Sequence, residues 1–88
     1  MDDIPYDRER CNAKNVECKF IGAAAIATAL DANKLVESSN YYGIPNAWKT
    51  NNGYRCMLLQ YCNVTEDKTF ATAAEAAEWF EEMFRATE

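Results

Sequence analysis

The sequence predicts an α+β fold, in which a small antiparallel sheet of two or three strands packs against a C-terminal helix. An alanine-rich helix precedes the sheet in the chain. Apolar residues recur at helical spacing after Gly22, and an Asn51-Asn52-Gly53 turn separates two stretches with β-strand character. A second amphipathic run begins at Thr72-Ala73-Ala74-Glu75, which has the form of a capping box. Because the chain has 88 residues, we expect a single domain over residues 1–88.

The first part of the chain divides into an arm and a helical segment. Residues 1–15 are polar and lack periodicity, which predicts an irregular arm. Residues 16–37 are expected to hold a short strand and a helix. Residues 16–20 alternate apolar and polar side chains like a further strand, although their apolar positions also fit a helix. A helix is predicted from Gly22 to about Val36, since alanine has the highest helix propensity.

Residues 41–88 are expected to form the sheet and the helix that packs on it. One strand is predicted at residues 47–50, with Pro45 limiting its extension, and a second at residues 54–62. Asparagine and glycine tolerate positive φ, so residues 51–53 suit the hairpin turn between them. After a polar connection at residues 63–66, a third short strand is predicted near residues 67–70.

The C-terminal helix has both a start signal and an apolar stripe. In a capping box the Thr72 oxygen and the Glu75 carboxylate each satisfy a free N–H group of the first turn. Apolar side chains then repeat at helical spacing, and glutamates occupy the other positions. The apolar set is Ala76, Trp79, Phe80, Met83 and Phe84, and the glutamates are Glu75, Glu78, Glu81 and Glu82.

The composition disfavours several classes of function. Fourteen acidic residues outnumber nine basic ones, giving a formal net charge of −5 without a basic run, so direct nucleic-acid binding is disfavoured. No apolar stretch approaches the roughly 20 residues of a membrane helix. The N-terminus begins Met1-Asp2-Asp3 and lacks the basic start of a secretory signal. We therefore expect a soluble cytoplasmic protein with no membrane partner.

Few residues offer catalytic or metal-binding chemistry. The chain has no histidine, so Cys–His and Ser–His pairs are impossible, and its three glycines form no phosphate-binding loop. The cysteines Cys11, Cys18, Cys56 and Cys62 lack common zinc-site spacing. On one strand, Cys56 and Cys62 would lie about 20 Å apart, too far for a disulfide. We predict no enzyme, cofactor or metal, and free thiols, with disulfides and a metal site as alternatives for the cysteines.

The order of motifs in residues 41–84 resembles a known DNA-binding fold. The motifs are Tyr41-Tyr42-Gly43-Ile44, then Gly53-Tyr54-Arg55-Cys56-Met57-Leu58-Leu59, then Phe70, Thr72 and Glu75-Ala76-Ala77. This order is similar to the AP2 DNA-binding domain and the related arm-binding domain of tyrosine integrases, each a three-stranded sheet backed by one helix. The resemblance implies that Tyr54, Cys56 and Leu58 face the helix.

The opposite face of this sheet departs from a DNA-reading surface. Alternation places Arg55, Met57, Leu59 and Tyr61 there. Arginine and lysine reach phosphates and base edges, and only Arg55 is of this kind. Met57, Leu59 and Tyr61 are typical of protein-binding surfaces. Alternatively, the alanine-rich helix covers this face and buries it in a three-layer arrangement.

The chain is similar in size, charge and composition to small phage-encoded anti-defence proteins, including anti-CRISPR proteins. We therefore predict a non-enzymatic phage or mobile-element inhibitor that occludes a nucleic-acid-binding complex in the host cytoplasm by protein–protein contact. The alternatives are an AP2-like or arm-type DNA-binding accessory module, relying on Lys49 and Arg55, and a structural adaptor. Monomer and dimer are both left open. The predicted partner-binding residues are Trp48, Arg55, Met57, Leu59, Tyr61, Glu75, Glu78 and Glu82.

Overall fold

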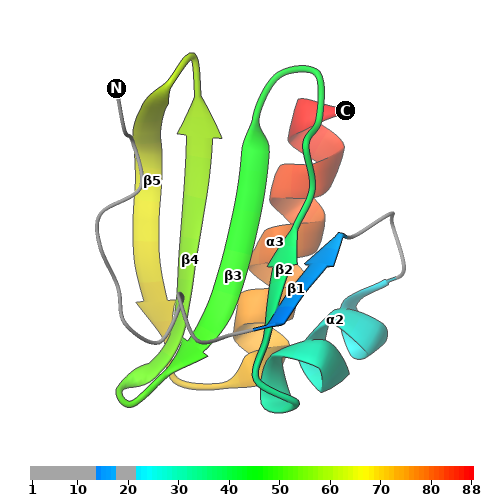
Figure 1. The fold of residues 1–88 in the computed structure, drawn as a ribbon, viewed down its shortest axis with the longest axis vertical. Coiled ribbons are helices and arrows are strands. Elements are labelled where there is room, and N and C mark those ends of the chain that lie inside the picture. The colour runs from blue at the N-terminus through cyan, green and yellow to red at the C-terminus, as the bar shows by residue number, and fades with distance from the viewer. Residues whose placement is uncertain (1–13, 18–21) are drawn as a thin grey trace.

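Figure 1 shows a computed structural model of the protein, which describes residues 14–17 and 22–88. In these residues the fold consists of one sheet and two helices. The sheet has five strands in the order β1-β2-β3-β4-β5. Strand β1 (Lys14–Glu17) runs parallel to β2 (Lys34–Glu37), and the remaining neighbours are antiparallel. The predicted α+β class is confirmed, with a larger sheet that includes the further N-terminal strand. This strand begins earlier than the predicted residues 16–20, because Lys14 and Asn15, which were predicted to lie in the arm, belong to β1. Residues 1–13 of the predicted arm and residues 18–20 of the predicted strand lie outside the described residues.

The alanine-rich helix α2 (Ala23–Asp31) ends earlier than the sequence predicted. Asn33 has a φ of 60°, a left-handed conformation that asparagine tolerates at the end of a helix. The chain then reverses into β2, where Leu35 and Val36 are buried on opposite faces of the sheet. The predicted helix to about Val36 was therefore wrong, because pairing with β3 fixes this short apolar run as a strand.

Strands β3 (Ile44–Thr50) and β4 (Gly53–Gln60) form the predicted hairpin. The two-residue turn at 51–52 lies between the opposed residues Thr50 and Gly53. Pro45 lies opposite Leu58 inside the ladder, so this proline does not limit the strand as predicted.

Strand β5 (Asn63–Phe70) is twice as long as the predicted third strand. Residues 63–66 belong to the strand, and the actual turn is Tyr61-Cys62, which shortens the predicted strand at 54–62. Both turn residues have positive φ, at 51° and 65°. Asn and Gly usually occupy such turns, so the residue types here gave no turn signal.

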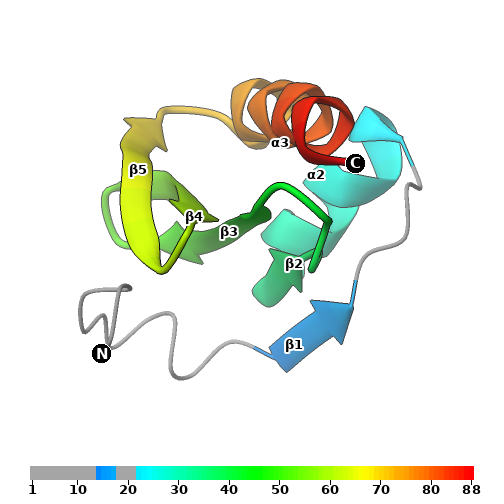
Figure 2. The same cartoon turned by 90° about the horizontal axis from the view of Figure 1, so that it is seen from above.

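The helices α2 and α3 (Ala73–Thr87) lie side by side on one face of the sheet, as Figure 2 shows from above. The alternative in which the alanine-rich helix covers the other face is therefore wrong. A main core lies between the helices and the sheet. Its buried residues are Ile26, Leu30, Val36, Ala47, Cys56, Leu58, Ala76, Ala77, Trp79, Phe80 and Phe84.

Helix α3 begins where the sequence predicted. The backbone N–H of Glu75 donates to Thr72 Oγ1 at 3.2 Å, which satisfies one N–H group of the first turn. Tyr54 packs against the main core that contains Cys56 and Leu58, so these three residues face the helices as expected.

The loop between β2 and β3 is tied to the last turn of α3. Asn40 Nδ2 donates to the carbonyl of Phe84 at 3.2 Å and to Thr87 Oγ1 at 3.0 Å. The N–H of Tyr42 donates to the carbonyl of Thr87 at 2.8 Å. Thr87 is the last residue of the helix, so its carbonyl has no N–H partner within the helix, and the bond from Tyr42 satisfies it. These bonds hold Tyr41 and Tyr42 beside the end of α3.

Candidate functional site

The structure divides the predicted partner-binding residues among three regions. Trp48, Arg55 and Met57 lie on the outer face of the sheet, which is the face away from the helices. Leu59 and Tyr61 line a hollow at one end of the sheet. The three glutamates line a groove beside α3.

On the outer face, Trp48 and Met57 are buried rather than exposed. Each has 0% of its surface exposed, and both belong to a second apolar cluster with Leu35, against which Val64 packs. Alternation along the strands explains why they lie opposite the helices. Trp48 and Met57 were predicted to contact a partner on an open surface. The structure instead places them in the core on the outer face of the sheet.

The outer-face arginine is paired with an acidic neighbour. Arg55 Nε and Nη2 donate to the two carboxylate oxygens of Asp67, at 3.1 and 2.8 Å. The same guanidinium lies 5.9 Å from the ring centroid of Trp48. Two parallel hydrogen bonds to a carboxylate fix a guanidinium strongly, so Arg55 would have to leave Asp67 to reach a phosphate. Lys49 is exposed near the hairpin turn.

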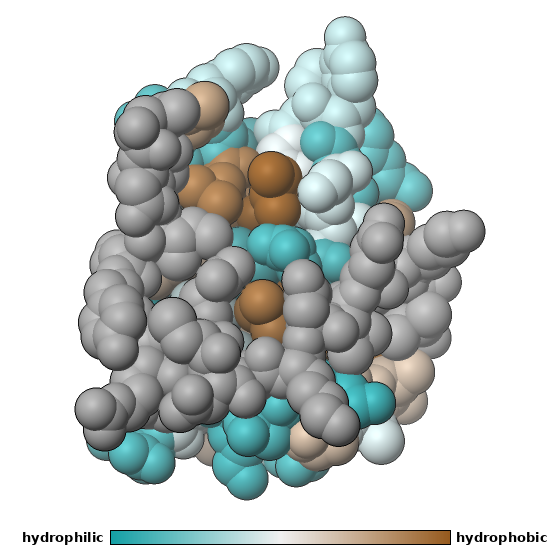
Figure 3. All heavy atoms as spheres, in the orientation of Figure 1, coloured by the Kyte–Doolittle hydropathy of each residue, from teal (hydrophilic) through white to brown (hydrophobic). Residues whose placement is uncertain are grey.

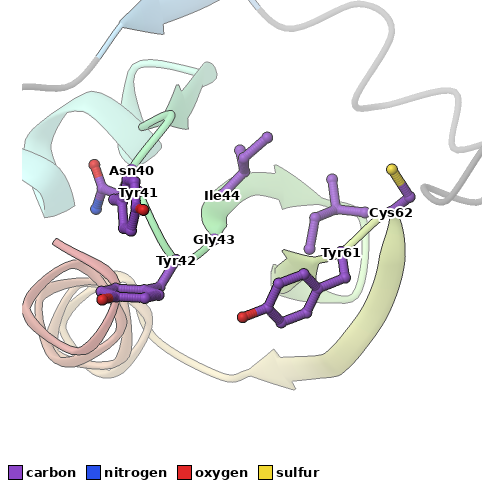
Figure 4. A pocket seen from close by; sticks show the side chains of 8 residues that line it. Asn40, Tyr41, Tyr42, Gly43, Ile44, Tyr61 and Cys62 are labelled. Atoms are coloured by element: carbon purple, nitrogen blue, oxygen red, sulfur yellow. The ribbon is translucent and has the colours of Figure 1, made fainter.

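Leu59 and Tyr61 line an uncharged hollow of about 340 Å³ between the loop at 40–43 and the turn at 61–62. Figure 4 shows Tyr42 and Tyr61 on either side of the opening, and Figure 3 shows hydrophobic surface gathered in this hollowed part of the outer face. Tyr41 and Tyr61 are each 85% exposed. Sequence reasoning missed Tyr41 and Tyr42 as surface residues, although two adjacent tyrosines in a loop were the available signal.

The glutamates predicted from helical spacing are brought together in a groove between β5 and α3. We call this site the acidic groove, and its volume is about 360 Å³. The groove is lined by Lys68, Phe70, Glu75, Glu78, Trp79 and Glu82. The glutamates are exposed, whereas Trp79 is buried and Phe70 is half-buried, so carboxylates stand beside an aromatic floor.

Negative charge dominates the acidic groove. Glu75 accepts a hydrogen bond from Thr72 Oγ1 at 3.0 Å. Within the part of the chain that the structure describes, Glu78 and Glu82 make no ion pair or hydrogen bond through their side chains. Lys68 Nζ lies 3.6 Å from Glu66, so its charge is already shared with a carboxylate. A cationic group entering the groove would therefore meet unpaired carboxylates.

The two described cysteines are free and lie in contrasting environments. Cys56 is buried in the main core, where burial, followed by the charge of Asp67, raises the pKa of its thiol to about 12. Cys62 is exposed at the edge of the hollow. The predictions for Cys11 and Cys18 lie outside the described residues. Residues 14–17 and 22–88 contain no group of three or more potential ligands that could hold a metal ion.

We expect these two thiols to differ sharply in reactivity. In a variant with Cys11 and Cys18 replaced by serine, iodoacetamide at pH 8 should label Cys62 and leave Cys56 unmodified, because the thiolate is the reactive form and Cys56 stays protonated. Mass spectrometry of the native and urea-unfolded protein would count one and two labels. Two labels at similar rates in the native protein would contradict the placement of Cys56.

Comparison with known proteins gives no relative. No family model, no curated protein and no solved structure matches the chain. Among the helices of the described segments, none is long and apolar enough to span a membrane.

Proposed function

We propose that this protein is a non-enzymatic inhibitor that binds a basic surface of a nucleic-acid-handling protein and blocks that surface by occlusion. The acidic groove carries the proposal. Arginine and lysine combine a cationic head with an apolar stem, and the groove offers carboxylates beside Phe70 and Trp79. Charge would steer the encounter, and the apolar contact would anchor it.

The net charge supports this class of target. Proteins that bind nucleic acid present arginine and lysine to phosphates. A chain with a formal net charge of −5 is attracted to such a surface and competes with the nucleic acid for it. Host defence complexes in the cytoplasm are targets of this kind, as in the anti-CRISPR type of inhibition. One copy of the inhibitor per target surface is sufficient for occlusion.

A DNA-binding accessory module is the second candidate. The antiparallel strands β3, β4 and β5 are followed by α3, which packs on all three, and this is the order that the AP2-like resemblance implies. The chemistry of the outer face favours it less, since Arg55 is paired with Asp67 and Trp48 is buried. A structural adaptor would use the tyrosine-lined hollow instead.

Fluorescence anisotropy separates the first two candidates. A labelled duplex DNA and a labelled arginine-rich peptide are each titrated with the protein at low salt and again at higher salt. We expect peptide binding that weakens as salt rises, and no DNA binding even at low salt, where electrostatic attraction is strongest. Salt-dependent DNA binding that is lost on Lys49→Ala and Arg55→Ala would overturn the inhibitor proposal in favour of the DNA-binding module.

A further inference from the structure

We propose that an extended basic segment of the partner binds as an added strand along the outer edge of β5 and places its cationic side chains in the acidic groove. This inference gives the binding mode and the chemistry of the bound segment. It rests on the proposed function.

Strand β5 offers an edge with which no other described strand pairs. It is the last strand in the sheet order, and none of the described residues pairs with its outer side (Figure 1). The strand is eight residues long, so the edge is longer than the short edges that proteins commonly use to avoid pairing. Addition of an extended peptide to such an edge is a general mode of recognition, in which backbone hydrogen bonds supply affinity and side-chain sites supply specificity.

The register identifies the backbone groups that face this edge. The carbonyl of Met57 points toward β3, where it accepts a hydrogen bond from an asparagine side chain at 3.4 Å. The carbonyl of Leu58 points toward β5, where it accepts a hydrogen bond from a threonine side chain at 3.3 Å. In an antiparallel ladder, opposed pairs alternate between bonded and non-bonded. Asp67 and Thr69 lie opposite Met57 and Arg55, so their N–H and C=O groups point away from β4.

The acidic groove lies where side chains of an added strand would reach. Lys68 and Phe70 of β5 form one wall, and the glutamates of α3 form the other. A new strand would lie about 4.8 Å beyond β5, with side chains on one face recurring every ~6.8 Å. Along the helix, Glu75 and Glu82 are separated by about 10 Å at ~1.5 Å per residue. Two cationic side chains two residues apart on the added strand, ~6.8 Å from each other, therefore fit within the distance between Glu75 and Glu82.

Charge complementarity selects the occupant. The exposed carboxylates of Glu75, Glu78 and Glu82 face the groove, and its lysine is already paired with Glu66. The favoured segment alternates arginine or lysine with uncharged residues, so that all cations point to the side of α3. The phosphates of a nucleic acid would be repelled by the same carboxylates.

A synthetic peptide in which arginine alternates with valine, labelled with a fluorophore, tests the binding mode. Methyl groups are placed on the backbone nitrogens of the arginines in one version and of the valines in another, because these two sets of N–H groups lie on opposite edges of an extended strand. We expect one version to lose on the order of tenfold or more in affinity, and the other to bind like the parent peptide. Equal binding of both versions and the parent would overturn strand addition.

A substitution in β5 gives an independent test. Thr69→Pro removes an N–H group from the outer edge, where proline is tolerated in edge strands, and Thr69→Val keeps that group as the matched control. We expect about tenfold weaker peptide binding for the proline variant only, with circular dichroism showing that both variants fold. A proline variant that unfolds leaves the decision to the methylated peptides.

The outcomes separate this inference from the function on which it rests. Binding that survives backbone methylation and Thr69→Pro, but is lost on Glu78→Lys with Glu82→Lys, would overturn strand addition and leave the groove as the site. Binding that survives every change would overturn both proposals. Concentration-dependent dimers of the protein alone that Thr69→Pro disrupts would assign the edge to a second copy and overturn the peptide proposal.

Discussion

Replacing Glu75, Glu78 and Glu82 together by lysine is expected to abolish binding of the basic partner while the fold is retained. The glutamates are exposed, so lysine can be accommodated without repacking the core. Each replacement changes the charge by two units, which moves the formal net charge of the chain from −5 to +1. Attraction in the groove then becomes repulsion, and we expect affinity for an arginine-rich peptide to fall by at least about 100-fold.

A matched pair of double variants separates a local effect from a general charge effect. Glu78→Lys with Glu82→Lys changes the groove, whereas Glu81→Lys with Glu88→Lys changes residues that do not line it. Both doubles have the same formal net charge. The measurement is the Kd for the peptide at constant ionic strength, with thermal unfolding as a check of the fold. Similar losses for the two doubles would contradict a role for the groove. The control double loses the Glu81–Arg85 pair at 4.0 Å, in which Arg85 is exposed and Glu81 is half-buried, and a long pair of this kind at the surface contributes little to stability.

Phe80→Ala is expected to destabilise the fold by about 3–5 kcal/mol. The Phe80 side chain is 0% exposed and belongs to the main core between α3 and the sheet. Truncation removes apolar contacts and leaves a cavity that neighbouring side chains only partly fill. The free energy of unfolding of a domain of this length is roughly 4–13 kcal/mol, so the loss is a large fraction of the total. We expect the Tm to fall by about 20 °C.

Urea unfolding followed by far-ultraviolet circular dichroism measures this loss for Phe80→Ala. Phe80→Leu, which keeps most of the apolar volume, is the matched variant and should cost less than half as much. A loss of less than about 1 kcal/mol for the alanine variant would contradict the packing of α3 on the sheet, since surface substitutions typically stay within ~0.5 kcal/mol.

Local signals predicted the elements whose structure is fixed by neighbouring residues in the sequence. Thr72 and Glu75 identified the start of α3 from their spacing, and its apolar stripe identified the buried side. The Asn51-Asn52-Gly53 stretch identified the central hairpin from its residue types, and of these three residues only Gly53 takes positive φ, at 137°.

Features that depend on distant contacts were less accessible to sequence reasoning. The strand predicted at residues 67–70 was shorter than β5, because the residue types of Tyr61-Cys62 gave no sign of a turn. Both residues nevertheless take positive φ. Alternation placed Met57 on the outer face correctly, but burial there depends on a second apolar cluster that includes Leu35, 22 positions earlier. Helical spacing selected the glutamates, whereas the groove that unites them also requires Phe70 of β5.

The position of α3 after every strand of the sheet has a consequence for synthesis of the chain. Until Ala73–Thr87 has been made, the inner face of β2, β3 and β4 has no α3 to cover its apolar side chains. At about 5–20 residues per second, those 15 residues take roughly 1–3 s to translate. During that interval the part of the inner face that α3 would cover exposes apolar side chains, and chains in such a state aggregate or recruit chaperones. A chain truncated before Ala73 is therefore expected to be insoluble, whereas the full chain includes α3 and can complete the core.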